Sequence, residues 1–528
     1  MSTSGRIRSN ARRRTARLAA VTTAIGLAAT GCGGTPAAGG DSTITIAIPA
    51  DPGSLDPITT VNSAALNMNE FAYDPLVHPS ANGTVIAGVA QTWSATTTSA
   101  SFTLHPGVTC QDGSPLRASD VAAEYNYIAD PKNQSPMLGL SVPVTTVAKA
   151  DDATRTVTLR TTTPAPFIVQ MAELLPLVCR RDLADSSALA RATDATGAYR
   201  LTQALPGDQY VYVKRAGYDW GPGGADGAAM PDKVVFKVVA SESTAANMLL
   251  AGEINVAEID GSDGNRLDAT RMRSQSLQQL SGELLFDESS GHATADAVVR
   301  RALAGAMDVA QIGAVATGGS GTPATNLGEI EPTPCSGDTV TGNVPSHDTA
   351  RAAAELTGDG WTKSGGTWVK DSRPLTVALT YPTGMDSEVD SAIQLMVQQW
   401  TAFGVKVTTT VSATIVSTLA SASWDVAWTP LGVALPNQLT PFFAGPRPPQ
   451  GSNFGGVDNP AYAALTARAS KLPGTAGCAL WNEADASLIK RVDVLPIEDS
   501  PKRVYGKGVT FQIDGSGAIP SSLRQIGG

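Results

Sequence analysis

The sequence is poor in charged residues and in histidine. Asp, Glu, Lys and Arg make up 16% of its 528 residues, against about 25% in average soluble domains. None of the four histidines, His78, His105, His292 and His347, stands in a His-Glu-x-x-His zinc motif or beside a recognisable nucleophile, and no Gly-x-Ser-x-Gly motif occurs. We therefore expect no metal site, no cofactor and no enzymatic activity.

Long apolar runs and excess positive charge are also missing. Beyond residue 31 no apolar run approaches the roughly 18 residues of a membrane-spanning helix. The formal net charge is −10, so nucleic acid is not an expected partner. Because 42% of the residues are apolar, the chain is predicted to fold into two or three packed units.

The N-terminus carries the pattern of an export signal. Six arginines precede an apolar run over residues 18–29, which is too short to span a membrane and is typical of a secretory signal peptide. The run ends in Ala29-Thr30-Gly31-Cys32, which resembles a bacterial lipobox, in which the cysteine is diacylated and becomes the new N-terminus. We therefore expect residues 1–31 to be the signal, Cys32 to be lipidated and residues 32–42 to form a flexible tether. The expected location is the outer face of the cytoplasmic membrane. The alternative is an ordinary signal peptide that is removed together with Cys32.

Four further cysteines suit an oxidising compartment. Cys110, Cys179, Cys335 and Cys478 are an even number in a chain expected to be exported, which predicts two disulfides. Three pairings are open to four cysteines, and the residues alone do not choose among them.

Strand and helix patterns alternate along the chain. Ile44, Ile46 and Ile48 alternate with small or polar residues before Pro49, which predicts a half-buried strand followed by a turn. Ser119 and Asp120 are candidate N-caps of a helix, and Gly404 is a candidate helix stop. The mixture favours an α/β fold with mixed α+β sheets. Strands are predicted at 101–104, 156–160, 210–215, 234–239 and 405–411, and helices at 118–128, from 296 onward and at 393–403.

A series of motifs resembles one protein family. The stretch Thr103-Leu104-His105-Pro106-Gly107-Val108, continued by Asp112-Gly113-Ser114-Pro115-Leu116-Arg117-Ala118-Ser119-Asp120-Val121, resembles a signature of the family 5 extracellular solute-binding proteins. These are the oligopeptide, dipeptide and nickel receptors of ABC importers. Most of the matching residues have structural roles, such as the turn at Asp112-Gly113, so the signature indicates the fold and not the ligand. Other matching blocks follow in the family's order: Ser54-Leu55-Asp56-Pro57, Tyr73-Asp74-Pro75-Leu76-Val77, Val89-Ala90-Gln91-Thr92-Trp93, Thr196-Gly197-Ala198-Tyr199, Tyr218-Asp219-Trp220-Gly221, Leu250-Ala251-Gly252-Glu253 and Val299-Arg300-Arg301-Ala302-Leu303.

The resemblance implies a two-lobed, periplasmic-binding-protein-like fold with an extra N-terminal subdomain. The first lobe would comprise residues 43–66, 194–286 and 494–528, and the extra subdomain residues 67–193. The second lobe would span residues 287–493, with crossings between the lobes near 286–288 and 493–496. Proximity within these units favours the disulfide pairs Cys110–Cys179 and Cys335–Cys478.

Ligands of such receptors lie between the lobes, and the motif alignment assigns candidate contacts. Asp51, Gly53 and Ser54 would line the cleft from the first lobe, and the segment from Trp424 through Asn437 would face them. Family members that bind peptides commonly hold the α-ammonium group with an acid in this second segment. Residues 432–443 contain no Asp or Glu, and a buried cation without a counter-charge is costly. The candidate contacts are therefore Asp51, Gly53, Ser54, Trp428, Leu431, Asn437, Asn453 and Phe454, with Asp51 as the nearest replacement anchor.

These features predict a lipid-anchored substrate-binding protein of an ABC importer. It would act as a monomer that captures a peptide or peptide-like solute and delivers it to permease subunits in the membrane. Two alternatives stay open. One is a receptor for a non-peptide solute, such as a glycoside or a metal chelate, and the other is a scaffold or regulator of envelope assembly built on the same fold.

Overall fold

The computed structural model describes residues 42–526, except 61, 180–182, 184–185, 226, 386 and 422. Asp41–Gly528 cluster into one compact unit. Cys32 and the predicted signal peptide lie outside the described residues, so the lipidation of Cys32 stays a prediction. Among the described residues, no helix is long and apolar enough to span a bilayer.

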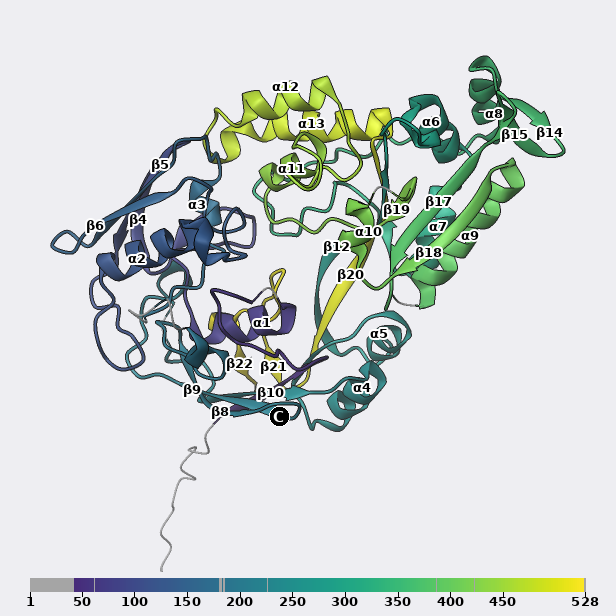
Figure 1. Ribbon diagram of the computed structural model, residues 1–528. Coiled ribbons are helices and arrows are strands. Elements are labelled where there is room, and N and C mark those ends of the chain that lie inside the picture. Colours follow the sequence, from purple (N-terminus) through teal and green to yellow (C-terminus); the bar gives the residue numbers. More distant parts are fainter. Residues whose placement is uncertain are drawn as a thin grey trace, which may run out of the picture. The chain divides into compact units, whose positions relative to one another are not determined.

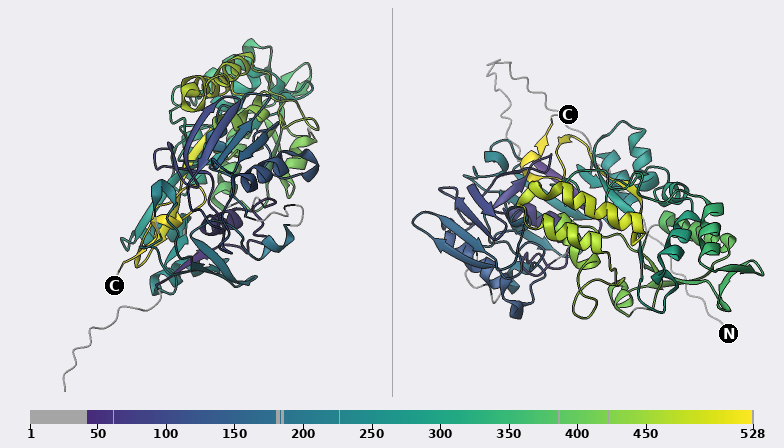
Figure 2. Two further views of the ribbon diagram at one scale, coloured as in Figure 1. Left: turned by 90° about the vertical axis from the view of Figure 1, so that its left-hand side faces the viewer. Right: turned by 90° about the horizontal axis from the view of Figure 1, so that it is seen from above.

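The central feature is an eleven-stranded mixed sheet, which agrees with the predicted α/β class. Two long antiparallel strands, β12 (Arg273–Phe286) and β20 (Val494–Gly506), run side by side through its middle (Figures 1 and 2). One side of this pair continues through β19 (Val426–Trp428) and β17 (Thr376–Pro382) to β18 (Lys406–Ser412), and β13 (Thr322–Pro323) pairs with β20. The other side continues through β11 (Val256–Glu258), β1 (Thr43–Ile48), β10 (Lys233–Val238), β9 (Gln209–Lys214) and β8 (Tyr199–Leu205).

The first strand shows why this sequence forms the sheet. Ile44, Ile46 and Ile48 of β1 are buried and alternate with more exposed residues, as the period-two pattern predicts. Strand β1 pairs in parallel with both β10 and β11. The predicted strands at 101–104, 156–160, 210–215, 234–239 and 405–411 also form, within one or two residues at each end.

The remaining strands form smaller sheets. A four-stranded antiparallel sheet contains β4 (Ala90–Thr96), β5 (Ser99–Leu104), β7 (Thr156–Arg160) and β6 (Val147–Asp151). The other small sheets are β2 (Val77–Pro79) with β3 (Val85–Ala87), β14 (Thr362–Ser364) with β15 (Thr367–Lys370) and β16 (Arg373–Pro374), and β21 (Val509–Thr510) with β22 (Arg524–Gln525).

The predicted helices form, with one correction at a helix start. The helix predicted at 118–128 is α2 (Ala118–Ala129), but its N-cap is Arg117. Asp120 acts from the third helical position, where its carboxylate accepts the backbone N–H of Arg117 at 3.0 Å, and Ser119 donates its hydroxyl to Asp152. The helix predicted at 393–403 is the C-terminal part of α9 (Ser387–Phe403), and Gly404 follows it with φ of +108°, as expected for a glycine stop.

The other helices lie between the strands in chain order. They are α1 (Ser63–Ala72), α3 (Ile168–Met171), α4 (Glu242–Ala251), α5 (Gly261–Asp268), α6 (Ala297–Gly305), α7 (Val309–Ala316), α8 (Thr349–Gly358), α10 (Ile415–Ala420), α11 (Thr440–Phe443), α12 (Pro460–Ala469) and α13 (Cys478–Arg491). Helices α12 and α13 pack side by side (Figures 1 and 2).

The buried hydrophobic residues form separate clusters. The largest, which we call the first core, draws on residues 44–256 and on the C-terminal stretch 504–523. The second core draws on residues 284–497, and a third cluster beside it contains Trp424 and Tyr462. The long strands β12 and β20 connect these regions. The lobe boundaries given above stay predictions.

Both disulfides are present in the structure. Cys110 is bonded to Cys179 within the part of the chain that forms the first core, and Cys335 is bonded to Cys478 at the start of α13. These are the pairs that proximity favoured.

Candidate ligand-binding site

A cavity of about 410 Å³ is lined by segments that lie far apart in the sequence. From the part of the chain around the first core come residues of α1, the loop after it and the C-terminal stretch 514–521. Residues 137–140 and 170–176 form another part of the lining, and residues 330–334 and 432–435 face it from the region of the third cluster. This volume lies within the range of about 300–1,000 Å³ that is usual for small-molecule sites.

The described lining residues include many acids. Five carboxyl side chains contribute to it: Glu70, Asp74, Glu173, Glu331 and Asp514. Among the described residues that line the cavity there is no Lys or Arg, and His78 is the only basic side chain. Burial lowers the pKa of His78 to about 4, so its ring is neutral at neutral pH.

The Asp74 carboxylate is already hydrogen-bonded within the protein. Its carboxylate accepts hydrogen bonds from the Tyr218 hydroxyl at 2.9 Å, the Trp220 indole at 3.2 Å and the Thr196 hydroxyl at 3.3 Å. Burial raises the pKa of Asp74 to about 6, although these three donors oppose the shift. Asp74, Thr196, Tyr218 and Trp220, which belong to three of the motif blocks, thus meet in one hydrogen-bonded junction at the cavity wall.

Glu70 and Asp514 form an acidic pair on one wall. Glu70 belongs to the last turns of α1, and Asp514 lies in a tight C-terminal loop whose amides at Ser516 and Gly517 donate to its Oδ1 at 2.9 and 3.2 Å. Asn67 of α1 holds this loop by donating to the Ser516 carbonyl at 2.6 Å. Burial raises the pKa of Glu70 well above its usual range, and repulsion from Asp514 adds to the shift. Burial also raises the pKa of Asp514.

Glu173 lies on another part of the lining, just after the short helix α3. Its Oε1 atom is buried and meets no hydrogen-bond partner. Burial raises the pKa of this carboxyl to about 8. Glu173 therefore holds a proton at neutral pH unless a cation is placed beside it.

A second set of contacts joins the chain around residues 140–171 to the region of residues 435–481. The rings of Phe167 and Trp481 lie 6.1 Å apart between centroids, and they share a small buried cluster with Leu435 and Met171. Backbone hydrogen bonds strengthen the contact, because Gly474 donates to the Pro166 carbonyl at 2.7 Å. Gln438 donates to the Leu140 carbonyl at 3.2 Å. We call the Phe167 and Trp481 pair, with these two hydrogen bonds, the closing contact.

The structure corrects the assignment of Trp428 as a ligand contact. Its side chain is fully buried in the second core, and a Cβ at Gly282 of β12 would collide with its ring. Trp424, which precedes β19, packs in the third cluster. Both tryptophans are core residues.

Asn453 is likewise a structural residue. It is 4% exposed, donates to the carbonyls of Gly445 and Val457, and accepts the Val457 N–H at 2.9 Å. These bonds use both ends of its amide, so it is removed from the candidate contacts.

The other predicted contacts lie outside the lining of the large cavity. Asp51 accepts the N–H groups of Gly53 and Gly207 and the Tyr210 hydroxyl, and Ser54 accepts the N–H of Asp56 at 3.3 Å. Gly53 supplies the left-handed turn between them, with φ of +68°. These bonds order the turn after β1. A ligand role for Asp51, Gly53 and Ser54 stays a prediction.

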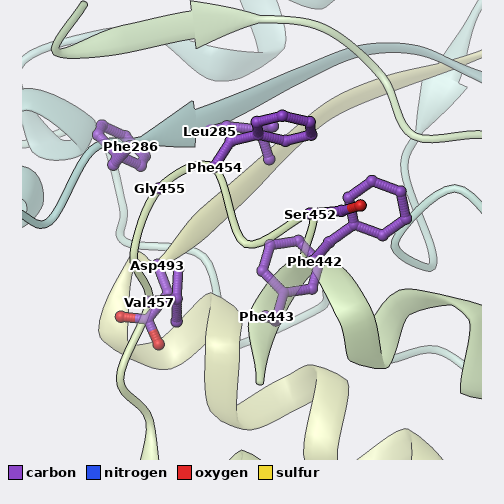
Figure 3. Close-up of a pocket in the computed structure, with 9 residues that line it drawn as sticks. All are labelled: Leu285, Phe286, Phe442, Phe443, Ser452, Phe454, Gly455, Val457 and Asp493. Carbon is purple, nitrogen blue, oxygen red and sulfur yellow. The ribbon is translucent and has the colours of Figure 1, made fainter. Parts of the chain in front are cut away.

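The facing segment contributes neighbours of the residues that were predicted. Gly432, Ala434 and Leu435 line the cavity, whereas Leu431 and Asn437 do not. Phe454 lines a separate hollow of about 10 Å³ together with Phe442 and Phe443 (Figure 3). That hollow has room for about one water molecule, so it is too small for a solute.

Sequence reasoning missed Glu70, Glu173 and Asp514. Each is an isolated acid outside the motif blocks, and the three come from α1, the chain after α3 and the C-terminal loop. An acid in a stretch that is otherwise apolar, as at Glu173 in Met171-Ala172-Glu173-Leu174-Leu175, was the available signal. Within the described part of the chain, no group of His, Cys, Asp and Glu is placed to hold a metal ion.

The sequence matches a known family over most of its length. The profile of the bacterial extracellular solute-binding proteins, family 5 middle region, matches residues 84–446. Among curated proteins, the chain is similar to the periplasmic murein peptide-binding protein MppA of Escherichia coli, with 24% identity over 229 residues. That match covers 39% of this chain and 42% of MppA, so it spans less than half of the relative.

Solved structures of similar fold cover nearly the whole chain. NikA from Brucella suis, in complex with Fe(III)-EDTA, superposes with a TM-score of 0.77 at 21% identity, covering 92% of this chain and all of that one. The substrate-binding protein CtaP from Listeria monocytogenes gives a TM-score of 0.76 at 20% identity, with coverage of 92% and 100%. At these identities the likeness establishes the fold alone.

Proposed function

The chain belongs to the bacterial extracellular solute-binding proteins of family 5, and on this premise we propose that it is the substrate-binding component of an ABC importer. It captures a peptide or peptide-like solute in the 410 Å³ cavity and delivers it to permease subunits. Membership of a solute-binding family agrees with the expectation of a binding protein rather than an enzyme.

The observation that carries the proposal is the construction of the cavity. Its lining combines residues 66–83, 137–140 and 514–521 with residues 330–334 and 432–435, so a movement between these regions would open or close it. The paired strands β12 and β20 are the natural hinge, because they join the two halves of the sheet. A binding protein needs such a site, and a scaffold does not.

The mechanism that follows is capture, closure and docking. The open form admits the solute, and closure about β12 and β20 brings the closing contact together and excludes water. The permease would then distinguish the closed form from the open one by its shape. The similarity to a murein peptide-binding protein supports a peptide-like solute.

Thermal unfolding with a solute panel tests the proposal. A ligand at 100 times its Kd adds about 2.7 kcal/mol of stability, so at least one peptide or peptide-like solute is expected to raise the Tm. Mass spectrometry of solutes released from the purified protein identifies candidates for the panel. A protein that carries no solute and whose Tm no peptide, glycoside or chelate raises would be a scaffold instead, and a rise with chelates or glycosides alone would make it a non-peptide receptor.

We also propose that Cys32 anchors the protein through acyl chains. Cys32→Ala is expected to move the protein from the membrane fraction to the soluble fraction, because the acyl chains would be its main membrane attachment. Ser42→Ala serves as the matched control and is expected to stay with the membranes. Equal membrane retention of both variants would rule out the anchor.

A further inference from the structure

We infer that the captured solute carries positive charge, and that its ammonium groups are held by Glu70 and Asp514 on one wall of the cavity and by Glu173 on another. This inference rests on the proposed binding function and specifies its ligand. In this inference the three acids take the place of the acidic anchor that residues 432–443 lack.

The first support is the charge balance of the lining. Within the described part of the chain, five carboxyl groups line the cavity and no Lys or Arg does. Two described cations act electrostatically on cavity carboxyls, Lys502 on Asp514 and Arg215 on Asp74, but both have other partners. Lys502 is paired with Glu258 at 3.1 Å, and Arg215 donates to the carbonyls of Thr109, Cys110, Ala195 and Gly197. A cationic ligand would therefore provide counter-charge that the described lining residues do not.

The second support is an unpartnered acceptor. Asp74 has three donors of its own, so it needs nothing from a ligand. Glu173 differs, because its buried Oε1 has no partner. A buried acceptor without a donor costs free energy unless a ligand donates to it.

The third support is an excess of backbone acceptors over backbone donors. Seven of the described lining residues are prolines, which offer a carbonyl acceptor but no N–H donor. Anions need N–H or O–H donors, whereas ammonium groups need acceptors. The backbone of the described lining therefore offers more acceptors than donors, which adds to the acceptors of its carboxyl side chains.

Cation binding would be linked to proton release. Burial gives Glu173 a pKa of about 8, so at pH 7 its carboxyl is protonated in the empty protein. Burial raises the pKa of Glu70 as well, with repulsion from Asp514 in the same direction and a hydrogen bond from Ser516 opposing it. Burial raises the pKa of Asp514, and the Ser516 and Gly517 amides and then Lys502 oppose that shift. A cation competes with these protons, so affinity is expected to rise with pH up to about pH 8, at most tenfold per pH unit for each proton released.

Calorimetry on the whole protein with four probes tests the inference. The probes are trilysine, spermidine, N-acetylated trinorleucine amide and triglutamate. Trilysine is expected to bind at least tenfold more tightly than the uncharged trinorleucine, and triglutamate is expected not to bind. Titrations at pH 7 in two buffers of different ionisation enthalpy are expected to show proton release with trilysine.

Variants connect the effect to the named carboxyls. Glu173→Gln and Asp514→Asn are each expected to weaken trilysine binding at least tenfold and to leave trinorleucine unchanged, and Glu173→Gln is expected to release fewer protons. Glu253→Gln, at an exposed acid outside the cavity, is the matched control and is expected to behave as the parent. The folding of each variant is checked by unfolding without ligand. The free energy of unfolding of the parent is expected to fall between about pH 4.5 and 8, because Glu173 ionises at a lower pH in the unfolded chain than in the folded protein. Glu173→Gln is expected to lose less stability over this range.

The outcomes distinguish a failure of the charge assignment from a failure of the proposed function. Binding of trinorleucine or triglutamate as tight as that of trilysine would overturn the charge assignment and leave a peptide receptor. Binding of spermidine without any peptide would support the charge assignment and overturn the peptide class. No binding of any probe would overturn both.

Discussion

Replacing Arg300 by methionine is expected to lower the free energy of unfolding by about 3–5 kcal/mol, the usual cost of removing one partner from a buried ion pair. Arg300 is 0% exposed and is the largest fully buried charged side chain among the described residues. Its Nη2 lies 3.0 Å from Asp493 Oδ1 and 3.2 Å from Glu288 Oε2. Methionine fills similar volume, so the loss would come from the uncompensated carboxylates rather than from a void.

The hydrogen bonds of Arg300 add to the expected loss. Its Nε donates to the Val492 carbonyl at 2.8 Å and its Nη1 to the Thr294 carbonyl at 2.9 Å. These acceptors lie next to the predicted crossings, where the chain enters β20 and leaves β12. Arg300 therefore holds together the chain segments that flank the proposed hinge.

Arg491→Met is the matched control. Arg491 also contacts Asp493, at 3.3 Å, but its side chain is 38% exposed, and exposed ion pairs typically contribute only about 0–1 kcal/mol. Denaturant unfolding of both variants decides the point. Equal losses in the free energy of unfolding for Arg300→Met and Arg491→Met would show that the burial of Arg300 does not determine how much its ion pairs stabilise the fold.

The sequence predicts the elements of this fold better than it predicts the site. Local patterns are sufficient for β1, where every second residue is buried, and for α9, which ends at a glycine. Arg300 also stands in a motif block that the family resemblance picked out. Such features depend on residues that are neighbours in the chain, and so they can be read from it.

The site depends on contacts that the chain order hides. Glu70, Glu173 and Asp514 are separated by more than 100 residues from one another, and only folding brings them to one cavity. Trp428 shows the reverse error: its place in the facing segment favoured a ligand contact, but strand alternation directs its ring into the second core. A tryptophan on a short strand is equally suited to a core and to a cleft, and only the partners in space distinguish them.

Replacing Phe167 by alanine is expected to lower the affinity for the solute by more than the loss in the free energy of unfolding alone would suggest. Phe167 is fully buried in the closing contact against Trp481, and truncating a buried Phe typically costs about 3–5 kcal/mol. If the contact forms only in the closed form, the truncation destabilises the closed form relative to the open form by this amount. A loss of about 3 kcal/mol corresponds to a shift of roughly 100-fold from closed to open, so affinity for a solute bound by the closed form would fall by up to that factor.

Phe443→Ala provides the control for that variant. Phe443 is 2% exposed and packs in the third cluster against Tyr462, away from both the cavity lining and the closing contact. It is expected to lower the Tm while leaving affinity and the radius of gyration of the empty protein unchanged. Phe167→Ala is expected to increase that radius in small-angle scattering and to weaken binding of the solute that co-purifies with the parent. If Phe167→Ala instead lowers only the Tm, as Phe443→Ala does, the contact belongs to a rigid interior. The cavity would then have to admit its solute by a route that leaves Phe167 and Trp481 together.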